Sequence, residues 1–283
     1  MNAVLRRLVV APLMPLLRTA ARSYVAGPEL RDAAVVAQSL ANRGAGSALC
    51  FWDAADDAPR HVADRYLDTL WEIARLGLDS YVSVKAPSLA FDGALVAEIA
   101  DEACRQGLGL HFDSLGPETA DRTFELIEAI RPQCASLGCT LPGRWRRSRQ
   151  DAEWAVRLGL NVRVVKGQWA EPEGGVDPRR GYLDVVEALA GRARKVAVAT
   201  HDPELAERAI RRLRQAGTPC ELELLFGLPS RAAVEVGRRL AAPVRFYIPY
   251  GHAWLPYGLH QATRNPRILW WMLRDAWSGA GVR

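Results

Sequence analysis

The chain has 283 residues, of which 49% are apolar, so it can bury one sizeable core and suits one large domain better than two. Its net charge of +5 does not indicate nucleic-acid binding, because acidic residues are interspersed with the basic ones and aromatic residues do not alternate with them. The five cysteines are scattered without a CxxC spacing, which argues against a disulfide framework or a metal centre and favours a reducing, cytoplasmic location.

Residues 1–44 are expected to form an N-terminal helical segment that flanks the main domain. Two arginines precede an apolar stretch from Leu8 to Leu17, which two prolines interrupt. This stretch is too short to span a bilayer, and no clear signal-peptide cleavage site follows it. Three interpretations stay open: a segment packed on the domain, peripheral contact with the inner face of the membrane, and export.

The rest of the chain, residues 45–283, repeats one pattern. Short apolar runs, often β-branched, recur at intervals of roughly thirty residues, and an amphipathic helical stretch follows each of them. Several helical stretches end on glycine, the usual helix terminator. The expected strands are Ala48 to Trp52, Ser80 to Val84, Leu108 to Phe112, Cys134 to Thr140, Val162 to Val165, Val196 to Thr200, Glu221 to Phe226 and Val244 to Ile248.

Eight such units predict an α/β protein with a TIM-type (β/α)8 barrel, preceded by the N-terminal helical extension and ending in C-terminal helices. An open doubly wound sheet would need a glycine-rich turn after its first strand. The residues at that place, ALCFWDAADD, contain no glycine.

Residues just past each strand of such a barrel face the site. Taken singly, each has a structural explanation, such as Asp202 capping a helix. Their convergence on one rim favours a binding site, and Lys85 and Asp113, which end adjacent strands, are the strongest candidates. The rim residues in chain order are Asp53, Lys85, Asp113, Leu141 with Pro142, Lys166 with Gly167, His201 with Asp202, Gly227, and Tyr247 with Tyr250.

The chain resembles the proline dehydrogenases, which are FAD-dependent (β/α)8 enzymes, in segments that follow one another in the family's order: SYVSVK, LHFD, NVRVVKGQW, VAVATHD, ELELLFG and VRFYIPYG. The family shows a SVKLS-like second strand, a VRLVKGAY-like fifth, an ATHD or ATHN sixth and a YVPYG-like eighth. The resemblance runs from about Ala26 to Asp275, and the ordered set is more specific than any single motif.

The resemblance implies roles for individual residues. Arg163 is similar to the arginine that contacts the flavin near its reactive nitrogen, where a cation stabilises reduced flavin. Lys85 is similar to the lysine that holds the substrate carboxylate, Asp113 to the acidic group that organises the site, and Tyr247 to the tyrosine near the substrate. The implied cofactor-binding residues are Arg163, Lys166, Gly167, Trp169, Thr200, His201 and Asp202.

The family's reaction is hydride transfer from a ring carbon beside the proline nitrogen to FAD, which a membrane quinone then reoxidises. The implied partners are therefore a small amine or imino acid and a quinone.

This sequence departs from the family at the carboxylate clamp. Two adjacent arginines of the family fall at His260 and Gln261, and a glutamate that buttresses them falls at Arg264. A histidine and a glutamine cannot imitate a bidentate guanidinium pair. Because residues four apart share one helix face, Arg264 and His260 could supply a relocated carboxylate receptor with Lys85, or Arg264 could simply end a helix.

Two further departures concern the flavin: a glutamine of the fourth strand falls at Pro142, and Trp169 replaces a tyrosine. The leading hypothesis is a flavoenzyme that oxidises proline or a related amine or imino acid. The alternatives are a proline dehydrogenase with a rearranged clamp, a barrel that has lost flavin and acts as a non-redox binding or accessory protein, and a lyase that uses Lys85 or Lys166 as a Schiff-base amine.

Overall fold

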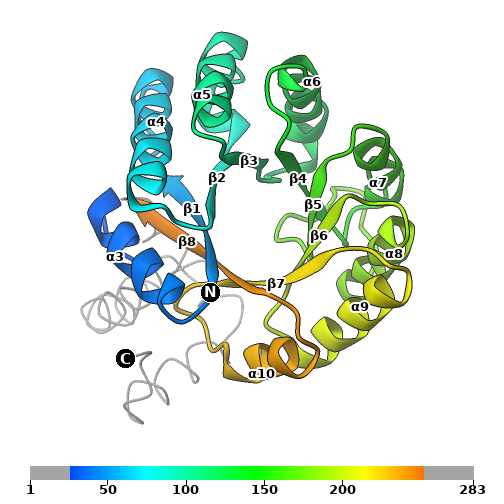
Figure 1. The fold of residues 1–283 in the computed structure, drawn as a ribbon. Coiled ribbons are helices and arrows are strands. Elements are labelled where there is room, and N and C mark those ends of the chain that lie inside the picture. Colours follow the sequence, from blue (N-terminus) through cyan, green and yellow to red (C-terminus); the bar gives the residue numbers. More distant parts are fainter. Residues whose placement is uncertain (1–25, 252–283) are drawn as a thin grey trace, which may run out of the picture.

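The computed structural model describes residues 26–251, and the expected helix that carries His260, Gln261 and Arg264 lies outside them. Within this range the eight strands close into one parallel barrel in sequential order (Figure 1). The strands are β1 Gly46–Trp52, β2 Ser80–Val84, β3 Gly109–Phe112, β4 Leu137–Pro142, β5 Asn161–Val165, β6 Lys195–Ala199, β7 Cys220–Leu225 and β8 Val244–Gly251.

Helices surround the barrel on its outside (Figure 1). They are α3 Leu30–Ala41, α4 Pro59–Leu76, α5 Gly93–Arg105, α6 Ala120–Ile130, α7 Ser148–Arg157, α8 Pro178–Leu189, α9 Pro203–Gln215 and α10 Arg231–Arg239, with short 3-10 turns η1 Ala86–Leu89 and η2 Pro117–Thr119. The (β/α)8 architecture expected from the sequence is therefore confirmed.

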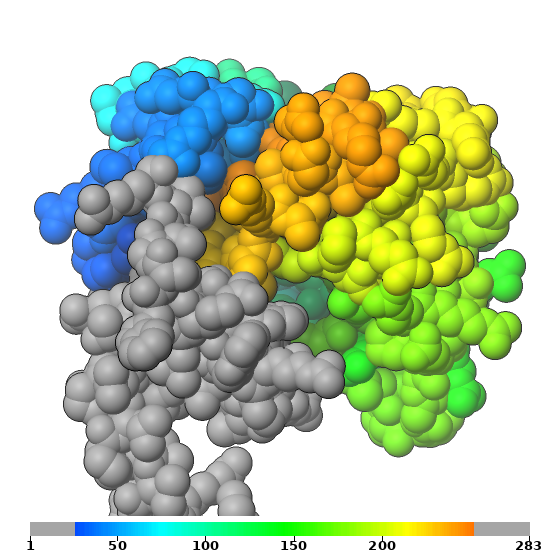
Figure 2. Space-filling model, turned by 90° about the horizontal axis from the view of Figure 1, so that it is seen from below, coloured from blue at the N-terminus to red at the C-terminus, as the bar shows by residue number. Residues whose placement is uncertain are grey.

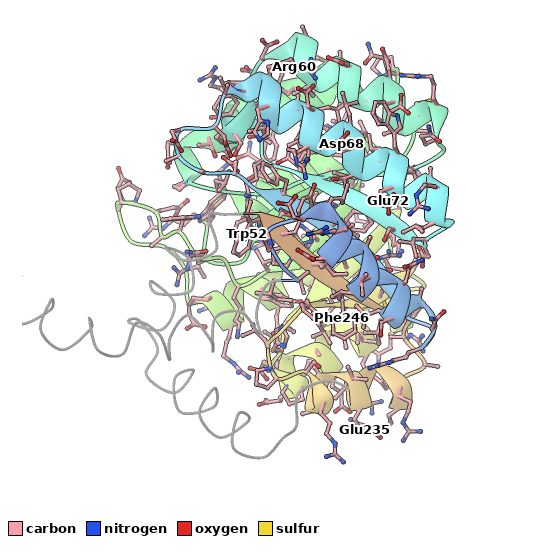
Figure 3. The ribbon with its side chains drawn as sticks, turned by 90° about the vertical axis from the view of Figure 1, so that its left-hand side faces the viewer. Trp52, Arg60, Asp68, Glu72, Glu235 and Phe246 are labelled. Carbon is pink, nitrogen blue, oxygen red and sulfur yellow. The ribbon has the colours of Figure 1, made fainter. Side chains whose placement is uncertain are left out.

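Helix α3 precedes the first strand and packs against β1 and β8, where it closes the ring of helices. Figure 3 shows it crossing these two strands, while α4 runs back from the end of the barrel where Trp52 is labelled. The space-filling view in Figure 2 shows the orange atoms that include α10 between the blue of α3 and the yellow of α9. No helix within residues 26–251 is long and apolar enough to cross a membrane.

Local sequence explains where these helices begin and end. Asp202 accepts a hydrogen bond from the backbone N–H of Leu205 and so caps α9, and Pro203 supplies the first residue of that helix. Helix α4 ends at Gly77, whose φ of 61° is left-handed and costs glycine nothing. These residues fix where α9 begins and where α4 ends.

Two strand boundaries differ from the sequence-based prediction by three residues, and most of the others differ by one or two. Strand β4 begins at Leu137 rather than Cys134, because the N–H of Cys134 still bonds the carbonyl of Ile130 at the end of α6. Strand β8 continues past Pro249 to Gly251, since β1 pairs with it on one side and its end is also bonded by Ala26 and Gly27.

The main core lies between the strands and the helices. Residues that alternate along each strand point outward into it, and the large side chains of Tyr66, Tyr182 and Tyr250 are fully buried there. Burial of each large apolar side chain contributes roughly 1.5–3 kcal/mol, so this outer shell supplies most of the stability. The other half of the strand residues points into the barrel, and many of these are polar.

Candidate active site

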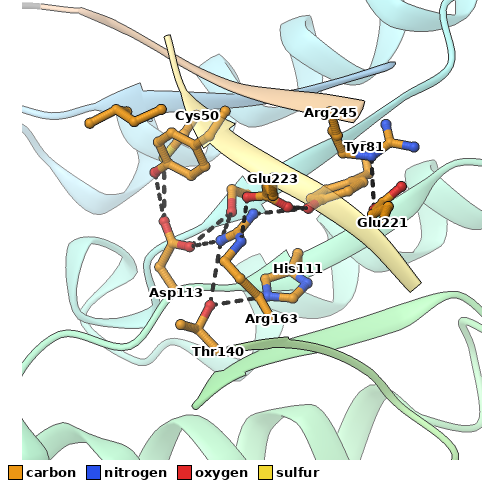
Figure 4. A network of polar contacts seen from close by, with 12 residues as sticks. Cys50, Tyr81, His111, Asp113, Thr140, Arg163, Glu221, Glu223 and Arg245 are labelled. Carbon is orange, nitrogen blue, oxygen red and sulfur yellow. Dashed lines mark hydrogen bonds and ion pairs between the residues drawn. The ribbon is translucent and has the colours of Figure 1, made fainter. Parts of the chain in front are cut away.

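The centre of the barrel holds one polar network around Arg163 of β5 (Figure 4). The Arg163 guanidinium is 4% exposed and donates to Asp113, which follows β3, and to the Tyr81 hydroxyl at 3.0 Å. It also donates to the hydroxyls of Ser83 at 3.1 Å and Thr140 at 3.4 Å. Side chains from β2, the end of β3 and β4 therefore converge on the guanidinium of β5.

A second carboxylate, Glu223 of β7, lies on the other side of Arg163. Its Oε1 is 2.6 Å from Nε of Arg163, although the N–H points away from the line between them, so the contact is an ion pair rather than an aligned hydrogen bond. The other oxygen of Glu223 accepts from the Tyr81 hydroxyl at 2.5 Å. One buried guanidinium thus lies between the carboxylates of Asp113 and Glu223.

Burial and charge act on these groups in opposite directions. Burial raises the pKa of Glu223 above its usual value, and the adjacent Arg163 only partly opposes that shift. Burial alone would lower the pKa of Arg163, but the neighbouring carboxylates outweigh it and raise that pKa further. Arg163 is therefore a permanent cation whose charge two carboxylates already compensate.

Asp113 links this network to the carboxyl end of the barrel. Its second oxygen accepts from the Tyr247 hydroxyl at 2.7 Å, and the Cys50 thiol lies 3.7 Å from the same oxygen. Nε1 of Trp52 donates to the Tyr247 hydroxyl at 3.4 Å. Burial raises the pKa of Cys50 to about 12 and that of Tyr247 well above 10, so neither residue is a nucleophile at neutral pH.

Lys85 lies above this network, just past β2. Its Nζ donates to the carbonyl of Phe51 at 3.1 Å and to Asp53 at 3.2 Å, and it lies 5.5 Å from the centre of the Trp52 ring. An ammonium has three N–H groups, so one remains for a ligand.

Residues after β6 are engaged in holding the turns at this end. The N–H of Leu225 donates to Nε2 of His201 at 3.0 Å, so the ring proton is on Nδ1, 3.0 Å from the carbonyl of Pro229. Burial lowers the pKa of His201, which favours this neutral form. Thr200 accepts from the N–H of Asp202, which caps α9 and pairs with Arg179.

The loop after β5 carries the remaining predicted cofactor residues. Gly167 has a φ of 89°, and a Cβ there would lie 2.7 Å from Cβ of Pro142, so only glycine fits. Arg144 donates to the carbonyl of Gln168 at 2.8 Å. Trp169 is 42% exposed, and Lys166 has no side-chain partner among residues 26–251.

The carboxyl-end mouth of the barrel has two unlike halves. Trp52, Lys85 and Asp113 give one half its polar groups. In the other half, three strands end in apolar residues: Val165, Ala199 and Leu225. Each follows an inward-pointing residue by two positions and therefore also points inward, and all three side chains are partly exposed. The mouth thus joins a charged edge to an apolar strip.

The structure brings together four of the predicted site residues, Lys85, Asp113, Arg163 and Tyr247, within two adjoining groups of contacts. It puts Lys166, Gly167, Trp169, Thr200, His201 and Asp202 on the rim. Sequence reasoning missed the interior partners, which are Cys50, Tyr81, Ser83, His111, Thr140 and Glu223. The alternation of glutamate and leucine in ELELL was the available signal, since inward and outward residues alternate along a strand.

No known family model matches the sequence, and no curated protein matches it. Solved structures do match the fold. The proline utilization A (PutA) protein from Bdellovibrio bacteriovorus, inactivated by N-propargylglycine, gives a TM-score of 0.77 at 15% identity over 86% of this chain. PutA from Corynebacterium freiburgense gives 0.73 at 17% over 92%, and PutA from Bradyrhizobium japonicum gives 0.68 at 18% over 84%.

The matched region covers 32%, 32% and 30% of those three PutA chains, so this chain spans about a third of their length. TM-scores between 0.68 and 0.77 show that the fold is shared, and identities of 15–18% show no more than the fold. The chain therefore has the (β/α)8 barrel found in proline utilization A proteins, which is the fold that the sequence resemblance implied.

Proposed function

We propose that this chain is a divergent proline dehydrogenase-like flavoenzyme that oxidises proline or a related amine or imino acid, with hydride transfer to FAD and electrons passed to a quinone. The shared fold and the ordered strand-end motifs support this proposal. The observation that carries it is the juxtaposition of Lys85 with the Asp113–Tyr247 pair at the carboxyl-end mouth.

Lys85 would receive the carboxylate of the substrate. Its ammonium keeps one N–H free while Asp53 and the carbonyl of Phe51 fix its position. A single lysine is a point charge without the bidentate geometry of paired guanidiniums, so a weaker and less selective grip on the carboxylate follows. The chain is therefore expected to accept more than one small amino or imino acid.

Tyr247 would form the wall beside the substrate. Its hydroxyl donates to Asp113, and Arg163 lies 5.0 Å from the centre of its ring, so both ends of the side chain are held. A tyrosine fixed in this way presents a rigid aromatic face and excludes water from the adjoining volume.

The residues at the mouth fit a flavin. Val165, Ala199 and Leu225 offer a partly exposed apolar strip of the kind that a planar aromatic ring covers, and Arg163 lies two residues below Val165 on the same strand. Lys166, Gly167, Trp169, Thr200, His201 and Asp202 on the rim are the residues proposed to hold FAD. When bound, FAD would supply the hydride acceptor.

Absorption spectroscopy of the purified, FAD-reconstituted protein tests the proposal. We expect flavin bands that bleach anaerobically on addition of proline or a related amine and return with a quinone analogue. Lys85→Met should raise the KM for carboxylate-bearing substrates at least tenfold, whereas the matched variant Lys195→Met, at the start of β6 and the opposite end of the barrel, should leave that KM unchanged. A protein that takes up no flavin, or whose flavin no amine reduces, would refute the proposal.

A second candidate is a barrel without flavin that acts as a binding or accessory protein. The placement of Arg163 between Asp113 and Glu223 favours it, because a compensated cation does little to stabilise a reduced flavin. The same spectrum distinguishes the two candidates. A Schiff-base lyase would be trapped at Lys85 or Lys166 by borohydride with a carbonyl substrate, and no adduct at either lysine excludes it.

We also propose a cytoplasmic location with peripheral membrane contact through residues 1–44, where the quinone would be met. Flotation of the full chain with anionic vesicles tests this contact. Recovery of the protein only in the unbound fraction would refute it.

A further inference from the structure

The barrel contains a hollow of about 200 Å³ at the amino ends of its strands, opposite the mouth described above. Barrel interiors are usually filled by layers of side chains. Here the positions at Gly109, Gly138 and Ala197 contribute little bulk, so the space between the strand starts stays open. We call this space the amino-end cavity. The polar residues that line it include Tyr81, His111, Asn161, Lys195, Glu221 and Arg245.

Charged groups form one wall of the amino-end cavity. Arg245 is 6% exposed and donates to Glu221 at 3.0 Å and to the carbonyls of Ser47 and Asp79, so its donors are used (Figure 4). Glu221 also pairs with Lys195 at 2.8 Å. Two cations therefore share one buried carboxylate, and the Asp79 carboxylate that also meets Arg245 is 79% exposed and screened by water.

The free donors of the cavity point to an anion. Lys195 uses one N–H on Glu221 and keeps the others, and the side-chain amide of Asn161 has no hydrogen-bond partner among residues 26–251. Arg245 is paired with Glu221 and Asp79, whereas Lys195 shares Glu221 and is 38% exposed, so its remaining N–H groups are the charged donors that a bound anion would meet.

His111 supplies an independent observation. It is 4% exposed, and its Nε2 lies 3.0 Å from the Thr140 hydroxyl. The Thr140 oxygen accepts from Arg163 at 3.4 Å and its own hydrogen can go to Nε2, and on this basis we assign the ring proton to Nδ1. Nδ1 has no hydrogen-bond partner among the described residues and packs over Gly138, where an added Cβ would lie 2.3 Å from it; both residues line the cavity. A buried side chain thus brings an unpartnered ring nitrogen to the lining of the cavity.

We propose that the amino-end cavity binds a small monocarboxylate, whose oxygens accept hydrogen bonds from Lys195, Asn161 and Nδ1 of His111. The cavity volume of about 200 Å³ suits an acid of a few carbon atoms. Tyr81, which borders the cavity, also bonds Arg163 and Glu223, so the ligand would adjoin the central network without entering the mouth.

Acetate titrations of the full chain labelled with ¹⁵N-histidine test the proposal, at constant ionic strength with chloride as the reference anion. The Lys85→Met background removes the carboxylate site proposed at the mouth, so the two sites are distinguished. We expect the His111 resonances to shift saturably with acetate and not with chloride. Lys195→Met should weaken acetate binding at least about tenfold, because a charge-assisted hydrogen bond is lost.

Lys166→Met is the matched control, since it removes a lysine at the opposite end of the barrel, and it should leave acetate affinity at His111 unchanged. Ala197→Leu fills the cavity and should abolish the shift while circular dichroism shows the fold retained. Unshifted His111 resonances, an equal response to chloride, or equal effects of Lys195→Met and Lys166→Met would overturn the proposal.

Discussion

Neutralising the two carboxylates beside Arg163, singly and together, is expected to have strongly non-additive effects on stability. The side chains of Arg163, Asp113 and Glu223 are only 4%, 15% and 2% exposed. With both carboxylates ionised, the group of three carries one excess negative charge in a site that water barely reaches. Glu223→Gln or Asp113→Asn alone leaves one carboxylate and one guanidinium, which is a balanced pair.

The magnitudes follow from this charge count. Each single variant loses a charge-assisted hydrogen bond of about 1.5–3 kcal/mol, but it also buries one charge fewer, so the net cost should be about 1 kcal/mol. The double variant leaves Arg163 buried without any carboxylate partner, which costs about 3–5 kcal/mol. The expected interaction energy between the two positions is therefore about 2 kcal/mol.

Urea unfolding of the four proteins measures this, with the free energy of unfolding extrapolated to water and the m-values compared. Thermal midpoints provide a second reading, at roughly 2–4 °C per kcal/mol for a chain of this size. Glu235→Gln is the control, because the Glu235–Arg238 pair is more than half exposed and should contribute almost nothing. If the losses of unfolding free energy in the two single variants add up to the loss in the double variant within about 0.5 kcal/mol, the two carboxylates do not compensate the same Arg163 charge.

Other consequences can be checked with the same assays. Burial raises the pKa of Glu223, so as the pH rises from about 4.5 towards the folded-state pKa, the unfolded state loses this proton before the folded state does. The free energy of unfolding of the wild type should therefore fall relative to that of Glu223→Gln over this pH range. A difference that does not change with pH would contradict the assignment. Burial lowers the pKa of His201, so the stability that its neutral ring contributes should be complete above pH 6.5 and decline below it, as the unfolded state takes up a proton; an NMR titration with a pKa at or above 6.5 would be inconsistent with this. Gly138→Ala should lower the free energy of unfolding by about 1–3 kcal/mol, because the added Cβ would lie 2.3 Å from Nδ1 of His111. Gly93→Ala, whose added Cβ would have its nearest neighbour at 3.9 Å, should leave that free energy unchanged. Equal effects of the two variants in urea unfolding would argue against the close packing at Gly138.

The barrel itself could be predicted from sequence because its signals are local. Each strand needs only a short β-branched run, and helix ends at Gly77 and Asp202 are marked by the residues that satisfy their backbone groups. The errors at Cys134 and Pro249 have a common cause. Which residues join a strand depends on partners distant in the chain, such as Ala26 beside the end of β8.

The candidate site was only partly predictable. Lys85 and Asp113 stand at strand ends, where parallel strands bring their side chains to one edge. Glu223 lies in the middle of its strand, and only its ion pair with Arg163 inside the barrel marks it as a site residue. The two residues are far apart in the sequence, so the sequence alone does not reveal this contact. For Asp202 the helix-capping explanation is confirmed, while its predicted contact with a cofactor stays a prediction.

The outward-pointing and the inward-pointing residues of the same strands have different roles. The outward residues form an apolar shell with the helices, whereas the inward residues form a hydrogen-bonded network of charged groups that contributes little net stability, since burying ions offsets their attraction. Inward residues can therefore change without loss of the barrel. The fold is therefore compatible with only 15–18% identity to the PutA structures, and the charge pattern around Arg163 and Lys85, rather than the fold, decides what the barrel can bind.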